Sequence, residues 1–227
     1  MIAIVSLLNI RRFYPKAALK PVTLSIRLWT GLVKKVCPPH YHCMDNNNLI
    51  WKEESRKDVF NCRVFTIQER NCRSPEGVVQ PFTVMNAADW AIVIPILETD
   101  RGREFVMVRQ WRHGSQEISI EFPGGVFEPG ETGAEAAARE MREETAWIAG
   151  TITPLGVMSP NPAIMSNRVH FFLAEDLTPA GGQDLDDDEY VEVRPIPADE
   201  VIRNMGKPPY IHSLMASALM LYLRRTS

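Results

Sequence analysis

Three glutamates are spaced so that they could bind a metal ion together. Glu140, Glu143 and Glu144 lie at positions i, i+3 and i+4 of a segment that we expect to be helical, so their side chains share one face. Like charges at this spacing repel by roughly a few tenths of a kcal/mol for each pair. Arg139 and Arg142 offset part of this charge. The three carboxylates therefore offer either an oxygen site for Mg²⁺ or a solvated acidic face.

A glycine-rich loop precedes these acids and favours the metal site. Gly124 and Gly125 allow the backbone to approach other atoms closely, and Pro129 with Gly130 makes a tight turn. Glu131 adds a fourth acid at the start of the helix. Together these residues would direct carbonyl and carboxylate oxygens toward one point, which is the ligand set that Mg²⁺ prefers.

The helix that carries the acids is expected over residues 132–145. Thr132 and Glu135 have the spacing of a capping box, which predicts that the helix starts there. Small side chains on another face predict close packing against a sheet, and this stripe consists of Ala134, Ala137, Ala138 and Met141.

Alternating apolar segments predict the strands that support this helix. Segments 59–68 and 78–85, joined by a turn at 74–77, predict a small antiparallel β subdomain near the N-terminus. Further strands are predicted at 91–97, 104–110, 117–122, 152–158, 169–174 and 191–196, and further helices from Ala198 and from Ile211. This order predicts an α/β fold in which helices cover a mixed sheet. We divide the chain into an extension (1–43), the β subdomain (44–85) and a main domain (86–227).

The predicted extension differs in charge from the rest of the chain. It carries seven Lys or Arg and no acid, and because the whole chain has a net charge of −3, the remainder carries −10. A main domain of this charge does not predict binding to nucleic acid. The basic segment suits a transit peptide, or a reading frame that begins before the physiological start at Met44. We interpret Cys37, His40, His42 and Cys43 as chance composition, since four ligands within seven residues leave little chain to wrap a zinc ion.

The apolar segments and the cysteines indicate where the protein works. No run of eighteen apolar residues occurs, so no membrane span is expected. Four cysteines do not form a dense disulfide framework, and they suit a reducing compartment. We therefore expect a cytoplasmic protein that acts on small molecules.

The loop and helix together resemble the signature of the Nudix hydrolase family, G-x5-E-x7-R-E-U-x-E-E-x-G-U, where U is a bulky aliphatic residue. Seven of its nine fixed positions are matched, by Gly125, Glu131, Arg139, Glu140, Met141, Glu143 and Glu144. Two positions depart, because Ala146 replaces the closing glycine and Trp147 replaces the last aliphatic residue. Alanine resists positive φ, so the helix could instead end near Gly150.

This resemblance implies a Nudix-type α/β/α sandwich and a divalent cation, Mg²⁺ or alternatively Mn²⁺. It implies that Glu140 and Glu144 are the main metal ligands, that Glu143 is a supporting ligand and that the carbonyl of Gly124 is a backbone ligand. Arg139 would orient the acids through a salt bridge. The metal would neutralise charge that develops at phosphorus and activate a water molecule.

The flanks of the motif resemble the ADP-ribose pyrophosphatase branch of this family. The segment VMVRQWRHG is similar to that branch's V-R-Q-Y-R strand, so Arg109 and Arg112 are expected to clamp a diphosphate. The segment EFPGG is similar to its E-x-P-x-G, and Pro162 lies near its marker proline. We therefore expect Glu121, Gly125 and Pro162 to lie at the substrate.

Aromatic and acidic residues outside the motif leave alternatives open. Trp90 or Trp111 could stack on adenine, or could be core or interface aromatics. The acidic loop 183–189 could be merely solvated, but it resembles the loop in which this branch places its catalytic base. Glu189 is then the first candidate and Asp187 the second, because Glu189 lies nearest the last predicted strand.

The resemblance implies hydrolysis of ADP-ribose, or of a related ADP-sugar, to AMP and a sugar phosphate. It also implies a homodimer in which the β subdomain takes part. Two alternatives remain open from the sequence: another substrate, such as a GDP-sugar, NADH or a nucleoside triphosphate, or a non-catalytic module that senses a nucleotide.

Overall fold

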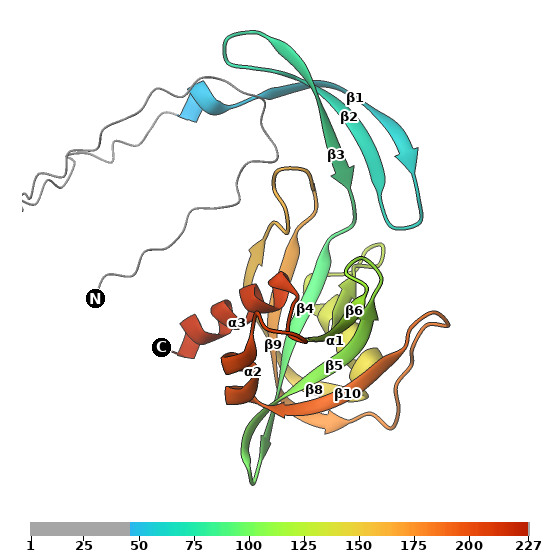
Figure 1. The fold of residues 1–227 in the computed structure, drawn as a ribbon, viewed down its shortest axis with the longest axis vertical. Coiled ribbons are helices and arrows are strands. Elements are labelled where there is room, and N and C mark those ends of the chain that lie inside the picture. The colour runs from blue at the N-terminus through green and yellow to red at the C-terminus, as the bar shows by residue number, and fades with distance from the viewer. Residues whose placement is uncertain (1–45, 227) are drawn as a thin grey trace, which may run out of the picture. The chain divides into compact units, whose positions relative to one another are not determined.

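The computed structural model describes residues 46–226 (Figure 1). The predicted extension, with its targeting and zinc hypotheses, lies outside the described residues. A short 3-10 helix, Asn46–Leu49, leads into the first strand. Within residues 46–226 no helix is long and apolar enough to cross a membrane.

Three antiparallel strands form a small sheet at the start of the described chain. They are β1 (Lys52–Asn61), β2 (Thr66–Arg73) and β3 (Val79–Asn86), paired in the order β1-β2-β3. The prediction of a small antiparallel sheet ahead of the main sheet is confirmed.

The turns of this sheet agree only in part with the sequence prediction. The predicted turn at 74–77 is confirmed, because the Gly77 amide donates to the Ser74 carbonyl at 2.9 Å. The prediction of one strand over 59–68 is wrong, because the chain reverses after Cys62, whose amide donates to the Phe65 carbonyl at 3.0 Å. This second turn contains no glycine or proline, so the usual turn signal is absent from the sequence.

Seven strands form the main sheet. They are β4 (Trp90–Thr99), β5 (Gly102–Arg112), β6 (Glu117–Glu121), β7 (Gly124–Val126), β8 (Trp147–Met158), β9 (Val169–Pro179) and β10 (Val191–Pro197). Their order is β10-β5-β4-β9-β8, with β6 paired to β5 and β7 paired to β4. β4 and β9 run parallel and the other pairs run antiparallel, so the predicted mixed sheet is confirmed.

Helices cover both faces of this sheet, as predicted. α1 (Gly133–Thr145) lies behind the sheet in Figure 1, whereas α2 (Ala198–Asn204) and α3 (Ser213–Thr226) lie in front of it. On β4, Ala91 and Val93 pack with α1, and Ile92 and Ile94 pack in the cluster that includes α3. A strand covered on both faces is apolar in both of its side-chain rows, which explains the continuous apolar run in the sequence.

Both ends of α1 are defined by their capping contacts. The predicted capping box is present, since the Thr132 hydroxyl accepts from the Glu135 amide and the Glu135 carboxylate accepts from the Thr132 amide. The helix ends at Ala146, whose φ is 59° and whose amide donates to the Arg142 carbonyl. The alternative end near Gly150 is wrong, because Gly150 lies inside β8. Alanine accepts a left-handed conformation here at a cost of roughly 1 to 2 kcal/mol.

The buried face of α1 is rotated relative to the predicted stripe. Ala134 is exposed, whereas Ala136, Ala137, Met141 and Glu144 are buried. The helix therefore turns one of its glutamates toward the protein interior, and this orientation builds the site described next.

Candidate active site

Two glutamates of α1 lie at the sheet rather than in solvent. Glu144 is 4% exposed, and the side chain of Glu140 is 12% exposed. One Glu144 carboxylate oxygen accepts from the amide of Gly124 at 2.9 Å. The loop that precedes the helix therefore holds a carboxylate that would otherwise be buried without a hydrogen-bond donor.

The two glycines of the loop are required by close contacts. A Cβ atom on Gly125 would lie 2.4 Å from a carboxylate oxygen of Glu140, and a Cβ atom on Gly124 would lie 2.2 Å from the Ala91 carbonyl. Gly124 thus allows β7 to approach β4, and Gly125 leaves the space that the Glu140 carboxylate occupies. This agrees with the close backbone approach expected from the sequence.

Arg139 links the acids of the loop and the helix. Its guanidinium donates to Glu131 at 2.8 and 3.0 Å, to Glu140 at 2.9 Å and to Glu143 at 3.1 Å, and also to the Val126 carbonyl at 3.0 Å. The hydrogen bonds with Glu131 raise the pKa of Arg139 and lower the pKa of Glu131. The structure thus places Arg139 where the family resemblance implies an orienting residue.

Burial changes the acidity of the two inner carboxyls. It raises the pKa of Glu140 to about 7, against the opposing attraction of Arg139. It raises the pKa of Glu144 to about 8, and repulsion from Glu140 and Glu189 acts in the same direction. Burial therefore outweighs the attraction of the neighbouring arginines at both carboxyls, and a further positive charge beside them would lower both pKa values.

The donor set fits a divalent cation, although it is not fully assembled. Within residues 46–226 no three carboxylate, histidine or cysteine side chains converge as a ready ligand set. On α1 the carboxylate of Glu143 accepts a hydrogen bond from Arg139 and does not complete a set of three ligands with Glu140 and Glu144. Glu140 and Glu144 nevertheless supply two adjacent hard oxygen ligands beside the glycine loop, which is what Mg²⁺ prefers. Gly124 enters this arrangement through its amide, and its carbonyl remains a predicted ligand.

The acidic loop is attached to the C-terminal end of α1. The side-chain amide of Gln183 donates to the Glu144 carbonyl at 2.6 Å, and the Asp184 amide donates to the Glu143 carbonyl at 3.0 Å. Glu189 and Asp187 are both exposed, but only Glu189 is among the charges that raise the pKa of both inner glutamates. Gln183 was not anticipated from the sequence, because its role depends on contacts far along the chain.

The two predicted arginines lie in different surroundings. Arg112 pairs with the fully buried Glu121 through two hydrogen bonds of 2.8 and 2.6 Å. Arg109 lies on the same face of β5 as Phe105, which packs against Tyr222 of α3. The Arg109 guanidinium donates to Glu192 at 2.9 Å. The structure therefore brings Arg112 and Glu121 to the site but places Arg109 on the sheet face opposite α1. Strand alternation separates these arginines, since they lie an odd number of positions apart.

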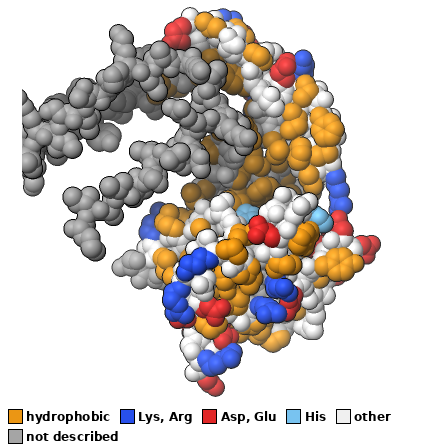
Figure 2. All heavy atoms as spheres, in the orientation of Figure 1, with side chains coloured by type: hydrophobic (Ala, Val, Ile, Leu, Met, Phe, Trp, Pro, Cys, Tyr) orange, Lys and Arg blue, Asp and Glu red, His pale blue; other side chains and the backbone are white. Residues whose placement is uncertain are grey.

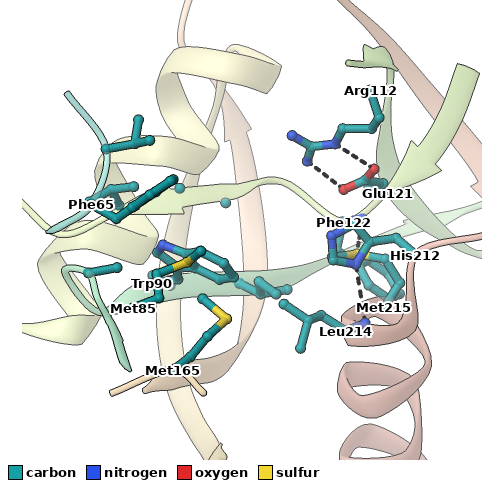
Figure 3. A pocket seen from close by; sticks show the side chains of 17 residues that line it. Phe65, Met85, Trp90, Arg112, Glu121, Phe122, Met165, His212, Leu214 and Met215 are labelled. Atoms are coloured by element: carbon teal, nitrogen blue, oxygen red, sulfur yellow. Dashed lines mark hydrogen bonds and ion pairs between the residues drawn. The ribbon is translucent and has the colours of Figure 1, made fainter. Parts of the chain in front are cut away.

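A pocket of about 300 Å³ opens beside the glycine loop (Figure 3). In Figure 3 aromatic and thioether side chains line one end, and a polar group lies at the other end beside the apolar Phe122, Leu214 and Met215. The first end comprises Phe65, Met85, Trp90 and Met165, and the second comprises Arg112, Glu121 and His212. Gly124 and Gly125 also line the pocket, so it adjoins the carboxylates. Trp90 is thus a pocket residue as well as a neighbour of the core.

Pro162 and Trp111 lie outside the lining of this pocket. Pro162 is exposed and does not line this pocket, to which its loop contributes Met165 instead. Trp111 is 47% exposed and borders a second pocket. His212 was not anticipated, because nothing in the sequence places a residue just before the last helix next to Glu121.

Replacing Gly125 by alanine should lower kcat at least tenfold. The added Cβ would displace the Glu140 carboxylate, because their separation would be 2.4 Å. Steady-state kinetics and Mg²⁺ titration would show a lower kcat and a weaker metal affinity. Gly182→Ala is the matched control, because a Cβ there would meet no atom within 4 Å. Equal kinetics for both variants would show that the Glu140 position does not matter.

Comparison with known proteins agrees with this site. The NUDIX domain model matches residues 89–216, which include the glycine loop and α1, and the chain therefore belongs to the Nudix family of hydrolases. Within that family it resembles the ADP-ribose pyrophosphatase branch. It is 28% identical over 153 residues to the ADP-ribose pyrophosphatase of Bacillus subtilis, which covers 67% of this chain and 81% of that protein.

Two further comparisons concern enzymes named for ADP compounds. The chain is 25% identical over 165 residues to the ADP compounds hydrolase NudE of Escherichia coli, with 72% of this chain and 86% of that protein covered. A crystal structure of an ADP compounds hydrolase superposes with a TM-score of 0.67 at 23% identity, over 77% of this chain and 93% of that chain. This superposition supports the fold.

Proposed function

We propose that this hydrolase cleaves the diphosphate of ADP-ribose, or of a related ADP-sugar, to give AMP and a sugar phosphate in a Mg²⁺-dependent reaction. The observation that carries the proposal is the pair of buried carboxyls, Glu140 and Glu144, which the glycine loop holds beside a pocket with an aromatic end. The names of the two sequence relatives support an ADP-linked substrate.

Each residue of the site has a task in this reaction. Glu140, Glu144 and the Gly124 carbonyl would hold Mg²⁺, with Glu143 in support once it leaves Arg139. When bound, Mg²⁺ neutralises charge on the phosphate oxygens and lowers the pKa of a bound water molecule. Arg139 keeps the helix acids in position through its four hydrogen-bonded partners.

The acidic loop would supply the base. Glu189 would accept a proton from the attacking water while the water oxygen bonds to phosphorus. The bond between that phosphorus and the bridging oxygen breaks in the same step. Its carboxylate accepts from the Asp186 amide at 3.2 Å, which orients it within the loop. Its influence on the pKa of Glu140 and Glu144 supports its position near the reacting group.

The pocket would bind the nucleoside. Trp90 and Phe65 lie at its apolar end, where a base could stack on an aromatic ring. Gly124 and Gly125 line the pocket beside the carboxylates, and Arg112 lies at its polar end, so the diphosphate would lie along the glycine loop within reach of Arg112. In this arrangement Arg112, rather than Arg109, faces the substrate.

A substrate panel tests the proposed reaction. ADP-ribose, ADP-glucose, GDP-mannose, NADH and GTP would be incubated with Mg²⁺ or Mn²⁺, and the nucleotide products would be separated chromatographically. We expect AMP and ribose 5-phosphate from ADP-ribose, with the highest kcat/KM in the panel. Absence of ADP-ribose turnover alongside hydrolysis of another member would refute this substrate while keeping the enzyme class.

We also propose that two copies of the chain associate through the small sheet β1–β3. Large hydrophobic side chains are exposed along this sheet and the segment before it, and Figure 2 shows hydrophobic atoms over the same region. They are Leu49, Ile50, Trp51, Val59, Phe60, Val64, Val78, Val79 and Phe82. Exposed apolar groups gathered on one element are typical of protein interfaces.

Sedimentation velocity would test this dimer. We expect a dimer for the unmodified chain and a shift toward monomer for Phe60→Asp, because a charge would be buried without a partner in the interface. A monomer at all concentrations of the unmodified chain would contradict the proposal.

A further inference from the structure

His212 presents one ring nitrogen to the substrate pocket and uses the other to begin a helix. Its Nδ1 accepts a hydrogen bond from the Leu214 amide at 3.2 Å, in the first turn of α3. This contact satisfies one of the amides that a helix start leaves unpaired. An accepting Nδ1 has no proton, so the proton of the neutral ring resides on Nε2.

The charge state of His212 follows from its surroundings. Burial lowers the pKa of His212, and although the neighbouring Glu121 opposes this shift, Arg112 reinforces it. Both carboxylate oxygens of Glu121 accept from Arg112, so Glu121 and Arg112 largely neutralise each other. His212 is therefore a neutral Nε2–H donor at neutral pH, in a part of the pocket with little net charge.

This donor has no protein partner in the described part of the chain. No hydrogen bond joins His212 Nε2 to any residue from 46 to 226, whereas Nδ1 is occupied. His212 lines the pocket of Trp90 (Figure 3). With Arg112 and Glu121 it also borders a second pocket of about 510 Å³. In a mostly apolar pocket, a few fixed polar groups determine which ligand binds and in what orientation.

We propose that His212 is a specificity-determining residue whose Nε2–H donates to a hydroxyl group of a substrate sugar. The inference rests on the proposed function, because it assumes that a nucleoside diphosphate sugar occupies this pocket. An uncharged hydroxyl suits this position, since the positive charge of Arg112 is already taken up by Glu121 and the histidine adds none.

The hydroxyl could belong to the ribose of the nucleoside or to the distal sugar. AMP carries only the ribose of the nucleoside, and ribose 5-phosphate carries only the distal sugar. Isothermal titration of each product therefore distinguishes the two sources without requiring turnover.

Two substitutions separate the donor from the helix contact. His212→Asn keeps a side-chain acceptor for the Leu214 amide and removes the donor directed at the pocket, because asparagine is a good residue at a helix start. His212→Gln can place an amide N–H near the position of Nε2. His113→Asn is the matched control, since His113 is exposed and borders only the second pocket.

We expect His212→Asn to weaken binding of one of the two products about five- to tenfold, which is the effect of one lost hydrogen bond. KM for the sugar substrate should rise by a similar factor with kcat within about twofold, and His212→Gln should restore part of the loss. Unchanged binding of both products together with unchanged KM for every hydrolysed substrate would overturn the inference. An equal loss of product affinity in His212→Asn and His212→Gln, together with a lower Tm in both, would also overturn the inference. That result would show a purely structural role for His212. Absence of ADP-ribose turnover with His212-dependent product binding would instead refute only the proposed substrate.

Discussion

Glu144→Gln should reduce kcat by about three orders of magnitude, roughly 4 kcal/mol of activation free energy. Glutamine keeps the size of the side chain and an oxygen that can accept from the Gly124 amide, so the local packing should survive. It removes the negative charge that would bind Mg²⁺. The variant therefore separates the charge of Glu144 from its structural contact.

Stability should change in the opposite direction to activity. Burial disfavours the ionised form of Glu144, so the neutral glutamine should leave Tm without Mg²⁺ unchanged or higher. Added Mg²⁺ should raise the Tm of the unmodified protein, because a ligand that binds only the folded state stabilises it. This increase should be mostly lost in Glu144→Gln.

The control for this experiment is Glu128→Gln, which makes the same chemical change at an exposed position of the loop before α1. It should keep both kcat and the Mg²⁺-induced increase in Tm. If Glu144→Gln retained more than about a tenth of kcat, the assignment of Glu144 as a metal ligand would be wrong.

Features set by neighbouring residues could be predicted from the sequence. The capping box of Thr132 and Glu135 follows from a short spacing in the chain, and the close backbone approach at Gly124 and Gly125 follows from the residue type. The mixed sheet with helices on both faces also followed, because apolar runs of strand length alternate with turn signals and helical segments.

Features set by distant partners could not be predicted. Glu121 meets Arg112 only after β6 folds back onto β5, where Glu121 lies opposite Val108 and Arg112 lies opposite Glu117. The alternation of side chains along β5 turns Arg109 to the other face of the sheet. His212 lies 91 positions beyond Glu121 and meets it only through the packing of α3 on the sheet. The turn after Cys62 lacks the residues that usually indicate one.

Arg112→Met should destabilise the protein by about 2 to 3 kcal/mol at pH 7. Glu121 is fully buried, so removal of its partner leaves a charge without compensation, which costs roughly 3 to 5 kcal/mol for a fully buried pair. The expected loss is smaller here because the Arg112 side chain is 41% exposed and solvent screens the pair. Urea denaturation would measure it, with Arg194→Met, an exposed arginine paired with Glu192, as a control expected to lose less than about 1 kcal/mol.

The pH dependence of this loss has a defined sign. Burial alone would raise the pKa of Glu121, but the hydrogen bonds and charge of Arg112 hold it below its usual value of 4.5. A carboxyl whose pKa is lowered by folding contributes stability above its unfolded pKa and loses that contribution as pH falls. The penalty of Arg112→Met should therefore shrink below about pH 4.5. A penalty that is constant from pH 7 to pH 4 would show that the ion pair does not stabilise the fold.

The double variant Arg112→Met with Glu121→Gln separates folding from substrate binding. It buries no unpaired charge, so it should recover much of the stability that Arg112→Met loses, and the difference measures the coupling between the two side chains. If Arg112 also faces the diphosphate, KM should stay high in the double variant even though the fold is restored. Recovery of both stability and KM would assign Arg112 a structural role alone, and the diphosphate would then have to be held by the metal and the glycine loop.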